Sequence, residues 1–296
     1  MTDSATAAFR RLLAGPDVIM APGAPDPFYA RLVARTGFPA VYMTGAGTTA
    51  VRLSMPDIGL LTMTEMVDNA ARIVDASGLP VIADCDNGYG GPLNVRRAIQ
   101  SYERAGVAAV HMEDQIIPKR CGHFSGKQLV SAEEMVTKIK AAVDAKTDSD
   151  FVVIARTDAI AVEGFDAAMD RAAMYEEAGA DMLFVEAPTD TRQLAKIGSN
   201  FSVPHVANLA SSRRTPLLPA EELGELGFKL VIYPGLLLLS TIRAALSCLD
   251  HLKEKRTWAG MEADLPTFDE MLTLMGMEEV ESLEERYALP EQGGTR

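Results

Sequence analysis

The chain has 296 residues, of which 48% are hydrophobic and 23% charged, and its formal net charge is −13 at pH 7. This ordinary composition argues against disorder, collagen and coiled coil, and a single α/β barrel commonly needs about 250 residues or more. The negative charge argues against a nucleic-acid partner, which would require a basic face. It allows an anionic substrate, because local cations and a metal ion can override the overall field.

The first segment, residues 1–15, is expected to form a short amphipathic helix and lacks the continuous apolar region of a secretory signal. The longest apolar run, Leu236–Leu239, is too short to span a bilayer, so we expect no membrane partner. Three cysteines, Cys85, Cys121 and Cys248, form no even disulfide framework. A cytoplasmic protein is therefore expected.

Eight short apolar runs, rich in β-branched residues, alternate along the chain with segments of helical periodicity. The runs are Val18–Ala21, Ala40–Thr44, Val81–Asp84, Ala109–Glu113, Phe151–Thr157, Met182–Glu186, His205–Asn208 and Leu230–Tyr233. The helical segments include Asn94–Ala105, Ala132–Ala145, Phe165–Ala178 and Ala220–Leu226. A glycine often separates a helical segment from the next run, which is typical of βα units.

Eight such units without a long linker predict one α/β domain over residues 1–296, a (β/α)₈ TIM barrel over about residues 16–250. An open doubly wound sheet is the alternative, but it usually has fewer strands and a Gly-rich first turn, which is missing here. Residues Ser240–Glu254 and Asp269–Leu283 are predicted to form extra C-terminal helices, over about residues 240–290. We expect these helices to pack against a neighbouring subunit.

Polar residues gather at one end of the predicted strands, where the active site of such a barrel lies. They are Thr44, Gly45 and Ala46 after the second run, Asp84 and Asp86 after the third, Glu113 after the fourth, Arg156 after the fifth, Glu186 after the sixth and Asn208 after the seventh. This asymmetry indicates a functional site.

Two of these acids, Asp84 and Asp86, lie two residues apart, so on an extended segment both face one side while Cys85 faces the other. Together with Glu113 they form a dense negative cluster, which is unfavourable without a cation. Oxygen ligands without histidine suit Mg²⁺, or Mn²⁺, rather than Zn²⁺. The alternative is that these are solvated acids at strand ends.

The segment Lys119-Arg120-Cys121-Gly122-His123 forms a predicted loop after the fourth strand, running to Gly126-Lys127. A thiol beside three basic side chains ionises easily and can transfer a proton at carbon near neutral pH. The glycines would allow the loop to close over a substrate. The alternative is a surface loop with an incidental cysteine.

Two further features point to carboxylate binding, and a third residue, Tyr42, has an open role. Thr44–Thr49 offers backbone N–H groups in a turn of small residues. Arg156 could pair bidentately with a substrate carboxylate, or form a structural ion pair with Asp158 or Glu186. Tyr42 shares the strand face of this turn, and either reaches the site or belongs to the core.

With these residues in view, the sequence resembles the isocitrate lyase/phosphoenolpyruvate mutase superfamily over nearly its whole length. The matching stretches are Tyr42–Gly45, Pro56–Gly59, Asp84–Gly90, His111–Gln115, Pro118–His123, Ile154–Ala159 and Ala207–Asn208. The resemblance is strongest to the short members: 2-methylisocitrate lyases, 2,3-dimethylmalate lyases and carboxyphosphonoenolpyruvate phosphonomutases.

The resemblance implies a helix-swapped homotetramer of TIM barrels and Mg²⁺ held by Asp84 and Asp86, with contributions from Asp57 and Glu113. It implies a small carboxylate substrate bound by Thr44, Gly45, Ala46, Lys119, Gly122, Arg156, Glu186 and Asn208. It also implies a mobile catalytic loop that contains Arg120, Cys121 and His123.

We therefore expect a Mg²⁺-dependent carbon–carbon lyase that cleaves a 2-hydroxy di- or tricarboxylate of the methylisocitrate or dimethylmalate type. Tyr42 or Glu113 would take the hydroxyl proton, and Cys121 would protonate the departing carbon. The products would be a 2-oxo acid and a second carboxylate.

One departure from the superfamily follows the seventh strand, where Ser211 replaces the usual Glu and Arg213 and Arg214 enter. This departure weakens the case for methylisocitrate and leaves open another dicarboxylate, or one with an extra anionic group near Arg213. A carboxyphosphonoenolpyruvate phosphonomutase and an oxaloacetate decarboxylase or hydrolase are the alternatives. A non-catalytic binding barrel is the remote one.

Overall fold

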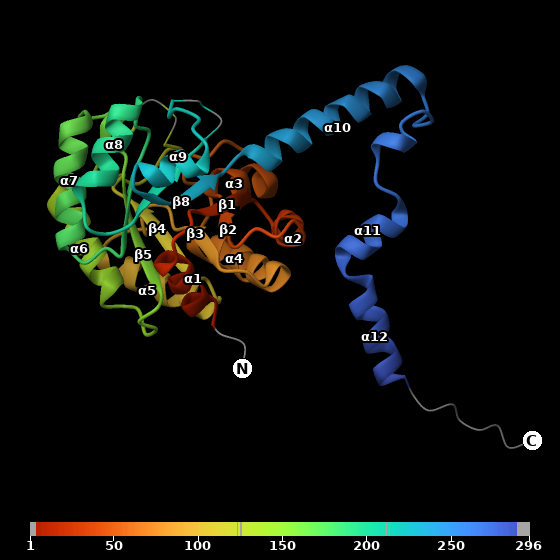
Figure 1. Ribbon diagram of the computed structural model, residues 1–296, viewed down its shortest axis with the longest axis horizontal. Coiled ribbons are helices and arrows are strands. Elements are labelled where there is room, and N and C mark those ends of the chain that lie inside the picture. The colour runs from red at the N-terminus through yellow and green to blue at the C-terminus, as the bar shows by residue number, and fades with distance from the viewer. Residues whose placement is uncertain (1–3, 123, 125, 211, 213, 289–296) are drawn as a thin grey trace, which may run out of the picture. The chain divides into compact units, whose positions relative to one another are not determined.

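The computed structural model describes residues 4–288, apart from positions 123, 125, 211 and 213, and its contacts divide the chain into two compact units, Met1–Ser240 and Thr241–Arg296 (Figure 1). The first unit contains eight parallel strands that close into a barrel in sequence order, with β8 paired to β1. The strands are β1 (Ile19–Ala24), β2 (Val41–Met43), β3 (Val81–Asp84), β4 (Ala109–Glu113), β5 (Val152–Thr157), β6 (Met182–Val185), β7 (His205–Asn208) and β8 (Phe228–Tyr233). The predicted TIM barrel is confirmed.

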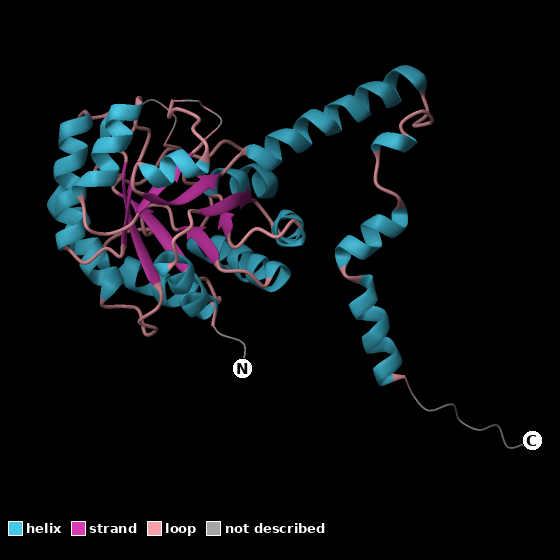
Figure 2. Cartoon of the chain, in the orientation of Figure 1, coloured by secondary structure: helices cyan, strands magenta, loops and turns pink. Residues whose placement is uncertain are grey.

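Helices surround the strands of this unit, as Figure 2 shows. They are α1 (Ala5–Ala14), α2 (Pro27–Arg35), α3 (Gly45–Leu53), α4 (Met63–Ser77), α5 (Pro92–Arg104), α6 (Ala132–Val143), α7 (Phe165–Glu177), α8 (Thr191–Asn200) and α9 (Ala220–Glu225), with a 3₁₀ turn at Ala159–Ala161. Local sequence sets their ends: Thr62 and Glu65 form a capping box before α4, and Gly78 ends that helix in the left-handed conformation.

The core has two parts because the side chains of each strand alternate between the barrel interior and the surrounding helices. Ile82, Ile154 and Phe184 belong to the interior cluster, whereas Val81 and Val153 pack toward the helices. Two residues beyond the interior-facing Ile82, Ile154 and Phe184 lie Asp84, Arg156 and Glu186. The strand period therefore carries polar side chains to the C-terminal mouth of the barrel.

The end of the chain contains α10 (Leu236–Lys255), α11 (Phe268–Met275) and α12 (Met277–Tyr287), with a 3₁₀ turn at Glu262–Asp264. The single helix predicted over Asp269–Leu283 is wrong, because Gly276 adopts a φ of 86° that ends α11 and separates it from α12. In the described part of the chain, no helix is both long and apolar enough to cross a membrane.

Candidate active site

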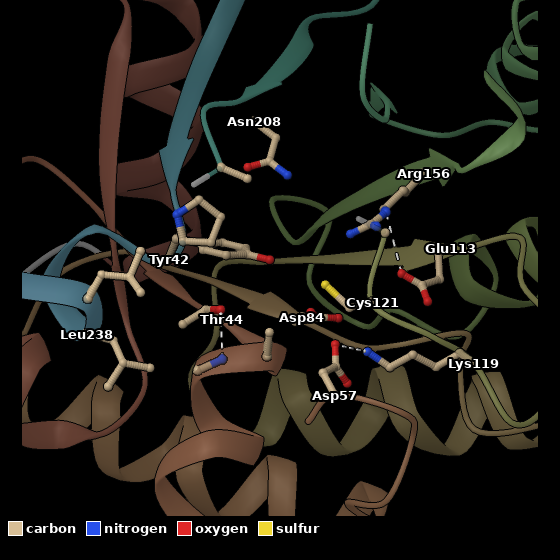
Figure 3. Close-up of a pocket in the computed structure, with 17 residues that line it drawn as sticks. Tyr42, Thr44, Asp57, Asp84, Glu113, Lys119, Cys121, Arg156, Asn208 and Leu238 are labelled. Carbon is tan, nitrogen blue, oxygen red and sulfur yellow. Dashed lines mark hydrogen bonds and ion pairs between the residues drawn. The ribbon is translucent and has the colours of Figure 1, made fainter. Parts of the chain in front are cut away.

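A cavity of about 190 Å³ opens at the C-terminal mouth of the barrel (Figure 3). Of the residues predicted from the sequence, its lining includes Tyr42, Thr44, Ala46, Asp57, Asp84, Glu113, Lys119, Cys121, Gly122, Arg156 and Asn208. These residues come from seven separate segments of the chain. They meet at one cavity because the carboxyl ends of parallel barrel strands converge there.

One wall of the cavity is the N-terminus of α3. The small-residue segment predicted as a turn is in fact the start of this helix, because the Thr44 side chain caps it by accepting a hydrogen bond from the Gly47 amide (3.2 Å). The Gly45 amide donates to Asp84 Oδ2 at 3.2 Å, and a β-carbon at position 45 would overlap that carboxylate. The Gly45 and Gly47 amides are thus already used by Asp84 and Thr44. Ala46, between them, lines the cavity, and the N-terminus of a helix favours anions.

Lys119 lies between two acids that the sequence assigns to a metal. Its Nζ is 2.8 Å from Asp57 Oδ2 and 2.6 Å from Asp86 Oδ1, and all three side chains are buried. Asp86 lines the neighbouring cavity rather than the one beside Asp84. The interpretation of an extended Asp84–Asp86 segment is wrong: the strand ends at Asp84, and Asp86 has a φ of 46° in the left-handed region.

The predicted metal ligands are therefore near one another without forming a ready-made cage. Among the described residues, no three His, Cys, Asp or Glu side chains are grouped closely enough to hold a metal ion. The donors nevertheless fit Mg²⁺ chemically, since they are hard oxygen ligands. Buried Glu113 also keeps an oxygen, Oε1, that accepts no hydrogen bond from any described residue.

The electrostatics of this acidic group reflect its burial. Burial raises the pKa of Asp86 to about 6, and Lys119 opposes that rise. Burial also raises the pKa of Glu113 well above its usual value, with Arg156 acting in the opposite direction. For Asp84, burial would raise the pKa, but the nearby His111, Lys119 and Arg156 lower it overall.

Arg156 is held by three carboxylates at the opposite wall. Its Nε and Nη2 donate to Asp158 at 3.1 and 3.2 Å, and it lies 3.4 Å from Glu113 and 3.5 Å from Glu186. The structural ion pairs, one of the two alternatives that the sequence offered, are present. The guanidinium also lines the cavity, so its pairing with a substrate carboxylate stays a prediction. Glu186, predicted to bind substrate, does not line the cavity. It contacts two residues that do, because it accepts a hydrogen bond from Asn208 (3.0 Å) and lies 3.5 Å from Arg156.

The loop after β4 brings the thiol to the cavity. Cys121 is half-buried, its amide donates to the Asp57 carbonyl at 3.0 Å, and its sulfur points toward the same space as Asp84 and Thr44 (Figure 3). Arg120 has an exposed side chain. His123, predicted to be catalytic, lies outside the described residues, as do Ser211 and Arg213.

Tyr42 donates or accepts a hydrogen bond of 2.8 Å with His111 Nε2 inside the barrel and also lines the cavity. Burial, together with the charge of Asp84, raises the pKa of Tyr42 well above its usual value. The phenol therefore keeps its proton near neutral pH.

Sequence reasoning missed an apolar part of the lining. Ala210, Pro234, Gly235, Leu238 and Leu239 come from the segments after β7 and β8. The site of such a barrel lies beyond the carboxyl ends of its strands, so the segment directly after the eighth predicted strand was also a candidate for the lining.

A (β/α)₈ barrel with buried carboxylates, a guanidinium and a thiol around a cavity at its C-terminal mouth has the organisation of a barrel enzyme. The family described as phosphoenolpyruvate phosphomutase matches residues 9–253. The chain belongs to this family, and the predicted membership of the isocitrate lyase/PEP mutase superfamily is confirmed.

Two curated relatives are named lyases. The 2,3-dimethylmalate lyase of Eubacterium barkeri is 45% identical over 95% of this chain and 98% of its own. The 2-methylisocitrate lyase of Shewanella oneidensis is 45% identical over 83% of this chain and 82% of its own. The prediction of a lyase of this superfamily is thus confirmed at the level of enzyme class.

Solved structures extend the comparison. A 2,3-dimethylmalate lyase described as a PEP mutase/isocitrate lyase superfamily member has a TM-score of 0.92, 36% identity and full coverage of both chains. Oxaloacetate acetylhydrolase bound to 3,3-difluorooxalacetate has a TM-score of 0.92 and 35% identity over 97% of this chain and 98% of its own. Phosphonopyruvate hydrolase with oxalate and Mg²⁺ has a TM-score of 0.87 and 31% identity over 97% of this chain and 100% of its own.

Proposed function

We propose that this enzyme cleaves the C2–C3 bond of an alkyl-substituted 2-hydroxy dicarboxylate, of the dimethylmalate type, to a 2-oxo acid and a second carboxylate. The observation that carries the proposal is the meeting of Cys121 with Asp84, Glu113 and Arg156 around one small cavity. Such a cleavage needs a group that removes a hydroxyl proton and another that protonates carbon. The names of the two curated relatives support the same reaction class.

The two ends of the cavity suit the two ends of such a substrate. The N-terminus of α3, through the Ala46 amide, and the guanidinium of Arg156 provide donors for carboxylate oxygens. Pro234, Leu238 and Leu239 provide an apolar wall that suits an alkyl substituent. An alkyl-bearing malate therefore satisfies both surfaces.

The bond changes follow from the positions of the residues. Glu113 accepts the proton of the 2-hydroxyl, whose oxygen then forms the C=O of the 2-oxo acid. The electron pair of the breaking C2–C3 bond moves onto the departing carbon, which takes a proton from the Cys121 thiol. Arg156 balances the negative charge that develops on the fragment, and Glu186, 3.5 Å from Arg156, helps to orient that guanidinium.

Asp84, Asp86, Asp57 and Glu113 would hold Mg²⁺, or Mn²⁺, whose charge would acidify the 2-hydroxyl and stabilise the developing oxo group. Hard oxygen donors, and the buried Glu113 Oε1 that accepts no hydrogen bond from the described residues, support this assignment. The phosphonopyruvate hydrolase bound to oxalate and Mg²⁺ supports it as well.

A panel assay tests the proposal. The purified protein is incubated with Mg²⁺ and separately with 2,3-dimethylmalate, 2-methylisocitrate and oxaloacetate, and the products are identified by nuclear magnetic resonance. We expect pyruvate from dimethylmalate, with slower or no cleavage of methylisocitrate. Release of no 2-oxo acid from either hydroxy acid would refute the lyase assignment.

Oxaloacetate hydrolysis is a second candidate, favoured by the similarity to oxaloacetate acetylhydrolase over 97% of this chain. In that reaction water adds to the C2 carbonyl of oxaloacetate, the C2–C3 bond breaks, and the departing C3 carbon takes up a proton, which gives oxalate and acetate. The oxaloacetate arm of the panel separates it from decarboxylation, which would give pyruvate and CO₂.

For the assembly, we propose a homotetramer in which the C-terminal helices pack against another copy of the chain. Large apolar side chains recur along α10, α11 and α12 and are exposed in the single chain: Ile242, Leu246, Leu249, Leu252, Phe268, Met271, Met275, Val280, Leu283 and Tyr287. No residue of α10 is buried. So many exposed large apolar side chains on three successive helices support an interface between subunits.

A further inference from the structure

Asp158, at the end of β5, connects the cavity to the loop that carries Cys121. It is completely buried and does not itself line the cavity. Its Oδ1 accepts hydrogen bonds from Lys127 Nζ (2.9 Å) and Arg156 Nη2 (3.2 Å). Its Oδ2 accepts from Gln115 Nε2 and from Arg156 Nε, both at 3.1 Å. One carboxylate therefore binds a loop residue, a strand-end residue and the site guanidinium together.

Two of these partners, Gln115 and Lys127, form hydrogen bonds with the main chain on either side of Cys121. The Gln115 side chain makes a pair of bonds to Arg120: Nε2 donates to its carbonyl (2.8 Å), and Oε1 accepts from its amide (3.0 Å). Lys127 Nζ donates to the carbonyl of Gly122. The residue before the thiol and the residue after it are thus each fixed by a partner of Asp158.

The burial of Lys127 indicates what holds the loop in place. Only 2% of its side chain is exposed, whereas Gly126 and Gln128 on either side of it are exposed. Arg120 and Phe124 are exposed too, so the described side chains of the loop bury little apolar surface. An ammonium group is stable in such a position only with a counter-charge, and Asp158 provides it.

We propose that Asp158 is a positioning residue that holds the Cys121 loop against the cavity through Lys127 and Gln115 while it orients Arg156 into the same cavity. The assignment deepens the function proposed above, on which it rests for the role of Cys121. If the loop moved away from the barrel, the ion pair between Lys127 and Asp158 would break. The proton donor and the carboxylate-binding guanidinium are thereby aligned by one shared group.

The experiment measures the reactivity of Cys121 rather than turnover. Wild type, Lys127→Met and Gln115→Ala are treated with N-ethylmaleimide, and labelling of each cysteine is followed by peptide mass spectrometry. Loss of a charged hydrogen bond frees the loop, so we expect Cys121 in Lys127→Met to react roughly tenfold faster. Lys140→Met, at an exposed position of α6, is the matched control and should label as wild type does.

Buried Cys85 reports on global unfolding in the same samples, and its labelling should stay negligible in every variant. If Lys127→Met does not fold, Gln115→Ala, which removes no charge, gives the test. A second readout is kinetic: misplacement of the thiol should lower kcat by about a hundredfold, with a much smaller change in KM.

If Cys121 is labelled at the wild-type rate in a folded Lys127→Met or Gln115→Ala variant, the proposed role of Asp158 is overturned. The labelling result does not depend on any substrate being cleaved. Inertness toward the acid panel therefore overturns the lyase proposal alone, and unchanged labelling in an active lyase overturns the positioning role alone.

Discussion

Gly122 lies directly against the guanidinium of Arg156, at a distance where a β-carbon on residue 122 would overlap Nη2 and come within 3.0 Å of Asp158 Oδ1. The loop that carries the thiol and the arginine at the end of β5 therefore fit together only if residue 122 has no side chain. The absence of a β-carbon is required here by close approach rather than by backbone conformation.

Gly122→Ala should lower kcat/KM by about a hundredfold, because either the thiol or the guanidinium must move by roughly an ångström. Steady-state kinetics on the best substrate of the panel measures this. Gly91→Ala is the matched control, since nothing lies near a β-carbon at that position, and it should behave as wild type does. Equal kinetics for the two variants would contradict the close fit.

Cys121→Ser should reduce turnover by about 10² to 10⁴, the range for loss of a general acid or base, and should leave substrate affinity largely intact. The serine hydroxyl keeps the shape of the side chain but is a much weaker acid. Cys248→Ser, outside the barrel unit, is the control. Full activity in Cys121→Ser would refute the role of the thiol.

Asp84→Asn should weaken binding of a divalent cation by at least about tenfold, because a hard cation loses a charged oxygen ligand. Mn²⁺ binding can be followed by the electron paramagnetic resonance signal of the free ion. Asp75→Asn, at an exposed position of α4, should bind Mn²⁺ as wild type does. Unchanged affinity in Asp84→Asn would remove Asp84 from the ligand set.

His205 makes the stability of the fold dependent on pH. Burial lowers its pKa to about 4, and the ring packs against Phe201 and Phe228. The folded chain therefore resists protonation that the unfolded chain accepts near pH 6.5. Neutral His205 therefore contributes to the free energy of unfolding above pH 6.5. This contribution, up to about 3 kcal/mol, is lost as the pH falls from 6.5 to about 4.

The test compares urea unfolding at pH 7 and pH 5 for wild type and His205→Phe. We expect the variant to lose less stability between the two values than wild type does. His251→Gln, in the second compact unit, controls for removal of any histidine. An unchanged pH dependence in His205→Phe would show that other groups are responsible.

Leu246→Lys should shift the assembly to smaller species, because it places a charge in the exposed apolar set of α10. Light scattering coupled to size-exclusion chromatography measures the mass. Lys253→Glu, which changes a basic residue in the last turn of that helix, serves as the control and should leave the mass unchanged. A wild-type chain that elutes as a monomer would contradict the proposed tetramer.

Much of the site was accessible from the sequence because it depends on two local regularities. Side chains alternate along a strand, and parallel strands end at one mouth of a barrel, so Asp84, Glu113, Arg156 and Asn208 were expected together. The cavity lining confirms that these four meet. The Cys121 loop was expected there for the same reason, since it follows β4 directly.

Other features depend on contacts between segments far apart in the chain. The sequence could not indicate that Lys119 bridges Asp57 and Asp86, or that Lys127 is buried on Asp158. Each pair joins two loops or a loop and a strand end, and an ion pair of this kind carries no periodic signal. The left-handed turn at Asp86 was also hidden, because a residue other than glycine rarely adopts it.

The sequence by itself determined the barrel, the family and the residue types available for chemistry, because strand and helix periods and short motifs are local properties of the chain. The tertiary structure alone decided which buried charges pair, which apolar residues close the cavity and how near the thiol lies to the guanidinium. Those outcomes depend on how the loops pack over the strand ends. Such contacts join residues that are far apart in the sequence, so they leave no periodic pattern along the chain.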